Sequence, residues 1–100
     1  MKTPTTPRIE LGQVVATPGA LDLLTRYQRN PQDFLNRHRH GDWGNLSSED
    51  WEANQNALET GARILSSYKL TDTVQLWIIT EAVGDNGRRA STCILLPEDY

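Results

Sequence analysis

The chain has 100 residues, of which 37% are hydrophobic and 23% charged, a composition typical of one small globular domain. No apolar run approaches the roughly 20 residues that a membrane-spanning helix needs, which excludes a transmembrane protein, and we expect no membrane partner. The net charge of −3 disfavours strong nonspecific binding to nucleic acid, because such binding depends on a basic surface.

Residues 1–8 contain three threonines and two prolines with little apolar content, which predicts a flexible leader before a single domain at residues 9–100. This segment lacks the apolar core of a secretory signal, so we expect a cytoplasmic protein. The single cysteine, Cys93, cannot form an internal disulfide, and its apolar surroundings predict a buried thiol.

Three helices are predicted in the first part of the chain, after a short extra strand at 12–16. The first helix, 18–29, follows Thr17 as N-cap and has proline at its first position. Its apolar residues recur at helical spacing and should face the core: Leu21, Leu24 and Tyr27.

The second and third predicted helices, 31–40 and 47–60, also have clear end signals. Asn30 is a good N-cap before Pro31, and Ser47 is an N-cap with an acidic residue three positions later. Gly61 supplies the left-handed residue that commonly closes a helix.

After Gly61 the apolar pattern changes to a period of two, which predicts strands at 62–70, 74–83 and 90–96. The second strand is apolar on both faces and therefore belongs in the middle of the sheet. Asn86-Gly87 predicts a hairpin turn before the third strand. The sequence thus predicts an α+β fold, in which a three-stranded antiparallel C-terminal meander packs against two to three N-terminal helices.

The three tryptophans have different predicted roles. Trp51 and Trp77 are expected in the core, because one lies at a helix start and the other in the central strand. Trp43 lies between Asp42 and Gly44, so a buried turn residue and an exposed anchor for a protein partner both fit the pattern.

The candidate groups for acid–base catalysis are weak. His38 or His40 would act as acid or base, with a carboxylate from Glu49 or Glu81 as partner. An arginine, Arg63 or Arg88, would hold a phosphate in such a nuclease. The two histidines are two residues apart and do not share a helix face, so we expect no metal site, and we expect no cofactor.

The basic residues predict two binding surfaces. One is a basic middle, which either faces the acidic segment that begins at Asp42 or binds an acidic partner; its residues are Arg26, Arg29, Arg37, His38, Arg39 and His40. Asp42 and Trp43, in the turn after it, are further binding candidates. Arg88-Arg89 follows the hairpin turn, where the two side chains either keep the tip solvated or dock a phosphate or carboxylate.

Five segments of the chain form a recognisable pattern: Gly12-Gln13-Val14-Val15-Ala16-Thr17-Pro18-Gly19-Ala20-Leu21, Gly41-Asp42-Trp43-Gly44, Leu65-Ser66-Ser67-Tyr68, Leu76-Trp77-Ile78-Ile79-Thr80-Glu81-Ala82 and Leu95-Leu96-Pro97-Glu98-Asp99-Tyr100. Together they resemble a family of small bacterial plasmid-related proteins that are usually labelled hypothetical. The resemblance implies a mobile-element context, in which small proteins often act by binding, and it implies no catalytic residue or cofactor.

Our leading hypothesis is therefore a non-catalytic protein-binding factor of a mobile element, for example an inhibitor of a host defence complex or a regulator. The alternative is a nucleic-acid-binding protein or small nuclease that uses His38 or His40 and the arginines.

Overall fold

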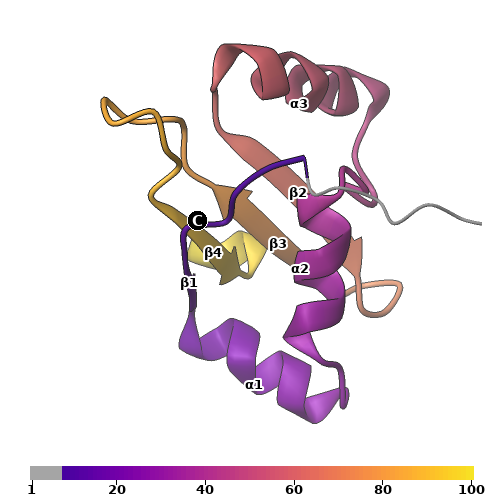
Figure 1. Ribbon diagram of the computed structural model, residues 1–100. Helices are drawn as coiled ribbons and strands as arrows, with labels where there is room; N and C mark the ends of the chain where they lie inside the picture. The colour runs from indigo at the N-terminus through magenta and orange to yellow at the C-terminus, as the bar shows by residue number, and fades with distance from the viewer. Residues whose placement is uncertain (1–7) are drawn as a thin grey trace, which may run out of the picture.

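The computed structural model describes residues 8–100, which form one four-stranded sheet and three α-helices (Figure 1). The α+β class predicted from the sequence is confirmed. The elements in chain order are β1 (Gln13–Ala16), α1 (Pro18–Arg26), α2 (Pro31–Arg39), α3 (Ser48–Thr60), β2 (Ile64–Lys69), β3 (Gln75–Thr80), β4 (Ser91–Leu95) and a 3-10 turn, η1 (Pro97–Asp99).

The sheet is mixed, with the strand order β1-β4-β3-β2. The antiparallel meander of β2, β3 and β4 is confirmed, and β2 is an edge strand as expected. The short extra strand predicted at 12–16 is present as β1, which joins the sheet parallel to β4, with Gln13 opposite Ser91, so the sheet is not purely antiparallel. Short-range turn signals do not predict this pair, since its two strands lie at opposite ends of the chain.

The predicted helix starts are confirmed, but α1 ends three residues earlier than the predicted Arg29. Gln28 has a φ angle of 54°, a left-handed conformation, and the Arg29 amide donates to the Leu24 carbonyl at 2.9 Å. This pattern closes a helix without a glycine. Leu21 is 50% exposed, so the buried face of α1 consists of Ala20 and Leu24 instead of the predicted set.

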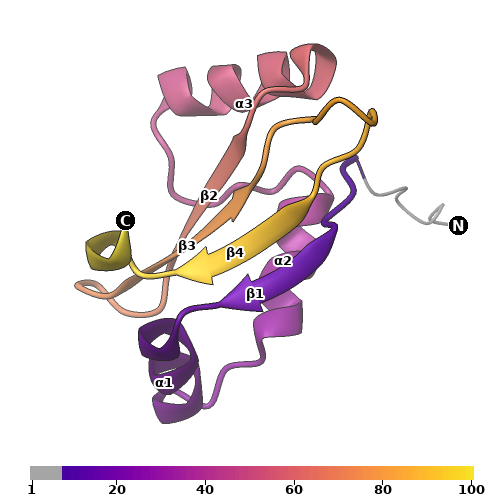
Figure 2. The same cartoon turned by 90° about the vertical axis from the view of Figure 1, so that its left-hand side faces the viewer.

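One face of the sheet is covered by α2, which buries Phe34 and Leu35 against the strands. The same core contains Tyr68 of β2, Ile78 of β3 and Ile94 of β4. Figure 2 looks onto the opposite face of the sheet, where no α-helix lies in front of the strands. Within residues 8–100, the sheet therefore has one face shielded by a helix and one face that no α-helix covers.

A second core lies under α3, where β2 begins (Figure 1). Trp43, Ala57 and Ile64 are fully or almost fully buried there, together with Ile9. Leu11 packs against both cores and so links them.

Residues 1–7 of the predicted leader lie outside the described residues. Arg8 is described, and its amide donates to the Arg39 carbonyl at the end of α2, at 2.8 Å. Among residues 8–100, no helix combines the length and the apolar content needed to cross a membrane.

The outer edge of β2 is closed by other parts of the chain. The Asn54 side chain of α3 accepts from the Leu65 amide at 3.2 Å and donates to the Leu65 carbonyl at 2.7 Å. At Ser67, the amide donates to the Trp43 carbonyl and the carbonyl accepts from the Asn45 amide. The outward-facing backbone groups that normally make an edge strand prone to pairing are thus satisfied at Leu65 and Ser67.

Replacing Asn54 with alanine should lower the free energy of unfolding by about 2 kcal/mol, because two partly buried backbone groups of Leu65 lose their partner. Chemical denaturation measures this change. Asn56→Ala on the exposed side of the same helix is the matched control and should change stability by less than about 0.5 kcal/mol. Equal effects of the two substitutions would contradict the edge-closing role of Asn54.

Candidate functional site

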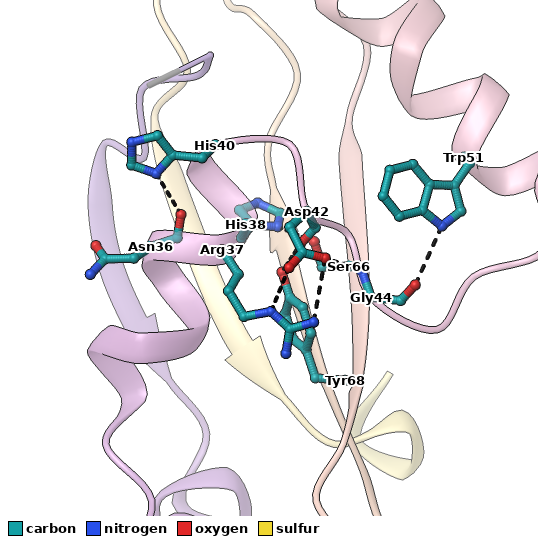
Figure 3. A network of polar contacts seen from close by, with 9 residues as sticks. All are labelled: Asn36, Arg37, His38, His40, Asp42, Gly44, Trp51, Ser66 and Tyr68. Atoms are coloured by element: carbon teal, nitrogen blue, oxygen red, sulfur yellow. Dashed lines mark hydrogen bonds and ion pairs between the residues drawn. The ribbon is translucent and has the colours of Figure 1, made fainter. Parts of the chain in front are cut away.

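His38 lies at the centre of a buried hydrogen-bonded network between α2 and the sheet. Its side chain is fully buried, with Nδ1 2.5 Å from the Ser66 hydroxyl and Nε2 2.8 Å from the Thr80 hydroxyl. Figure 3 shows the ring of His38 directed from α2 towards Ser66. The network continues from Thr80 to Thr92, at 2.7 Å.

The direction of the hydrogen bonds from Thr92 back to Nε2 of His38 follows from the last acceptor. Thr92 donates to the Leu11 carbonyl at 2.7 Å, and a carbonyl can only accept. Thr80 must then donate to Thr92, so it accepts from Nε2–H of His38. Because burial lowers the pKa of His38 to about 4, the ring is neutral at neutral pH, and Nδ1 then accepts from Ser66.

Burial lowers the pKa of His38 to about 4, and the positive charge of Arg89 contributes in the same direction. The ring is bonded to hydroxyl groups rather than to a carboxylate, and no part of it reaches solvent. Solvent and substrate therefore cannot reach the proton on its ring, so the position of His38 suits a structural role.

The other catalytic candidates lie apart from His38. His40, which caps α2, is half-buried, and its Nδ1 lies 2.7 Å from the Asn36 carbonyl (Figure 3). Glu49 is exposed in the first turn of α3, and Glu81 is exposed just after β3. No hydrogen bond among residues 8–100 joins either glutamate to His38, and no group of three or more potential ligands in this part of the chain could hold a metal.

Arg37 and Asp42 form an ion pair that anchors the loop after α2. Arg37 Nε lies 2.7 Å from Asp42 Oδ2, and its guanidinium lies 4.5 Å from the centre of the Tyr68 ring (Figure 3). The hydrogen bond from Arg37 holds the pKa of Asp42 below its usual value. The Tyr68 hydroxyl donates to the Asp42 carbonyl at 2.6 Å. These two predicted binding residues are therefore engaged with each other.

Trp43 is not the exposed anchor that the sequence allowed. It is completely buried and packs against Trp51, with ring centres 5.0 Å apart. Gly44 has a φ angle of 75°, and a Cβ at that position would lie 2.2 Å from the Ser67 carbonyl. The loop is thus held against β2, which places the preceding tryptophan under α3.

The two neighbouring arginines of the predicted hairpin tip have opposite environments. Arg88 is exposed and lies 3.6 Å from Glu10, whereas Arg89 is buried. The Arg89 guanidinium donates to the carbonyls of Ala62, Glu81 and Ala57, at 2.7, 3.0 and 3.1 Å. The prediction of an exposed binding role is therefore wrong for Arg89, which binds carbonyls at the end of α3 and of β3.

The basic middle is not neutralised across a helix pair, because α2 packs on the sheet face and α3 lies at its end (Figure 1). Arg39 is half-buried, and its Nε is buried with no hydrogen-bond partner. The side chain lines a cavity of about 450 Å³ beside β1, with Leu11, Val14 and Leu35. Among residues 8–100, Arg39 forms no ion pair, unlike Arg37.

Sequence reasoning missed the open face, which we define as Val15, Leu65, Trp77, Ile79, Cys93 and Leu95. These residues share a face because strand register places Trp77 opposite Leu95, and Ile79 opposite Cys93 and Leu65. Val15 lies opposite Cys93 at the margin. Trp77 is half-buried on this face, so its predicted place in the core is confirmed only in part. The two-sided apolar pattern of β3 was the available signal, but it indicates a covered strand equally well.

Two residues outside the sheet lie over this open face. The Tyr100 ring packs edge-on against Trp77 at 5.8 Å and is 68% exposed. Arg63 donates to the Tyr100 hydroxyl at 2.8 Å, and its guanidinium lies 5.5 Å from the same ring. A tryptophan, a tyrosine and an arginine therefore meet at one solvent-accessible place.

Acidification should destabilise the protein through His38. The pKa of His38 is about 4 in the folded state and about 6.5 in the unfolded state, so below pH 6.5 the unfolded state binds a proton that the folded state does not. The contribution of His38 to the free energy of unfolding is therefore constant above pH 6.5 and declines as the pH falls towards 4. The free energy of unfolding should fall by about 3 kcal/mol across this window. Denaturation at several pH values measures it, and His38→Gln should remove this component, whereas His40→Gln should retain it. Parallel curves for the wild type and His38→Gln would contradict the assignment.

Substitutions of the two adjacent arginines should affect stability differently, because Arg89 is buried and Arg88 is exposed. Arg89→Met leaves three carbonyls without their donor and should lower the free energy of unfolding by about 3 kcal/mol. Arg88→Met, as control, should change it by less than about 0.5 kcal/mol, because the side chain is exposed. Thermal and chemical denaturation provide the comparison, and similar losses for both variants would argue against the buried role of Arg89.

The features that bear on function are the sequestered His38, the half-buried Arg39 and the open face with its aromatic pair. Comparisons of the chain with protein-family models, with curated proteins and with solved structures find no match. Its function must therefore be inferred from its own residues.

Proposed function

We propose that this chain is a non-catalytic protein-binding factor that docks its partner on the open face of the sheet. The observation that carries this proposal is the meeting of Trp77, Tyr100 and Arg63 on a sheet face without a helical cover. Tryptophan, tyrosine and arginine are the residues most enriched where truncation costs most binding energy in protein interfaces. Contiguous apolar surface of this kind commonly marks an interaction site.

The burial pattern of the open face also suits a docking role. Ile79 and Leu95 are already shielded by their neighbours, at 8% and 6% exposure, while Val15 and Tyr100 remain accessible at 45% and 68%. A partner would therefore find a preformed, apolar centre with accessible residues at its margin. Such a surface binds without a large loss of side-chain freedom.

Protein binding is better supported than the alternative of a nucleic-acid-binding protein or nuclease. His38 is neutral and inaccessible, and the guanidinium groups of Arg37 and Arg89 are engaged by Asp42 and by backbone carbonyls. The net charge of −3 adds no general attraction for phosphate.

The resemblance to plasmid-related proteins suggests the setting of this activity. In that setting the chain would be a cytoplasmic factor of a mobile element, which blocks a host defence complex or regulates a process of the element. The partner would then be a host protein or a second product of the element.

Tyr100→Ala should weaken partner capture about tenfold, because it removes an accessible aromatic ring and the Arg63 contact. Pull-downs from host lysate with wild type, Tyr100→Ala and Tyr27→Ala as baits provide the measurement. Tyr27 is a partly exposed tyrosine just after α1 and serves as the matched control.

Capture should persist at raised salt, since an apolar interface depends on salt far less than phosphate contacts do. Recovery of no stoichiometric protein, or equal recovery on all three baits, would count against the proposed function. Loss of capture at raised salt together with recovery of nucleic acid would favour the alternative.

A further inference from the structure

The two edges of the sheet are treated differently by the fold. The β2 edge is closed by Asn54 and by the Trp43–Asn45 segment, whereas β1 is the outermost strand at the other edge (Figure 2). Proteins usually protect such an edge with charged residues, proline or a bulge. The β1 segment, Gln13–Ala16, contains no charged residue and no proline.

The register of β1 defines which of its backbone groups are free. Gln13 and Thr17 donate to the carbonyls of Ala90 and Ile94 in the β4 region, at 3.0 and 2.9 Å. Backbone groups alternate in direction along a strand, so the N–H and C=O groups of Val14 and Ala16 point away from the sheet. These are the groups that an added strand would use.

Arg39 makes this edge selective for a segment with an acidic side chain. The cavity of about 450 Å³ beside β1 has an apolar part, formed by Leu11, Val14 and Leu35, and Arg39 and Glu10 also line it. The Glu10 carboxylate lies 3.6 Å from Arg88. The buried Arg39 Nε has no acceptor among residues 8–100. Arg39 is half-buried and forms no ion pair among residues 8–100, so its positive charge favours a carboxylate on the incoming segment at this position.

We propose that β1 receives an extended segment of the partner protein by strand addition, with an acidic side chain of that segment bound at Arg39. A second copy of this chain is a poorer occupant, because β1 has no carboxylate to offer to Arg39. The added strand would also extend the open face beyond Val15, which lies at its margin. The proposal rests on the protein-binding function and specifies the form of the partner.

The test begins with random peptides displayed on phage and selected on the folded full-length protein. Enriched peptides should carry an acidic residue, and one of them is synthesised for calorimetry and for amide hydrogen exchange followed by NMR. In the wild-type protein, the amides of Val14 and Ala16 should gain protection when this peptide is bound.

Val14→Pro should weaken binding of the peptide at least about tenfold, because it removes only an outward-facing donor and proline is tolerated at such an edge position. Val14→Thr retains the amide and should change the affinity by no more than about twofold. Arg39→Gln should weaken binding of the acidic peptide about tenfold. It should leave unchanged the affinity for a control peptide in which the acidic residue is replaced by the corresponding amide, asparagine or glutamine.

Several results would overturn strand addition. These are failure to enrich any peptide, protection of amides elsewhere only, equal affinity for Val14→Pro and Val14→Thr, or a wild-type dimer in solution that Val14→Pro dissociates. If Tyr100→Ala abolishes partner capture while Val14→Pro does not, the protein-binding function stands and strand addition fails. If neither substitution affects capture, both proposals fail.

Discussion

The burial of one uncharged histidine between a helix and a sheet is the interaction on which the rest of the structure depends. Through Ser66, Thr80 and Thr92, His38 of α2 is linked to β2, β3 and β4, and the last hydroxyl reaches the Leu11 carbonyl before β1. Buried polar groups are stable only when each donor and acceptor is matched. Here the matching extends across three strands, so α2 can occupy only one position on the sheet.

Two other buried polar side chains, those of Asn54 and Arg89, hold elements together through hydrogen bonds to backbone groups. Asn54 satisfies the outer edge of β2, and Arg89 binds carbonyls at the end of α3 and near the ends of the neighbouring strands. A chain of 100 residues has a modest apolar core, so such side-chain-to-backbone bonds are an important supplement. Residues that resemble catalytic or binding groups in the sequence are therefore used here to hold elements together.

A partner can bind at the surfaces of the sheet that this internal network leaves exposed. One face of the sheet is covered by α2, and its β2 edge is closed by other parts of the chain. In the part of the chain that the structure describes, the open face and the β1 edge are the remaining accessible parts of the sheet. Both lie next to Val15, so a single partner can occupy them together. The aromatic pair supplies apolar contact area, while backbone groups and Arg39 supply orientation.

The sequence by itself determined the helix starts, the meander and the α+β class, because caps and hairpin turns act within a few residues: Thr17, Asn30, Ser47 and Gly61 have their predicted roles. It did not distinguish Trp43 from Trp77, or Arg88 from Arg89, since the two members of each pair have the same chemistry. Only the tertiary structure decided these cases. The parallel pairing of β1, the position of Gly44 against Ser67 and the absence of a helix over one sheet face depend on contacts between distant segments, which local patterns do not encode.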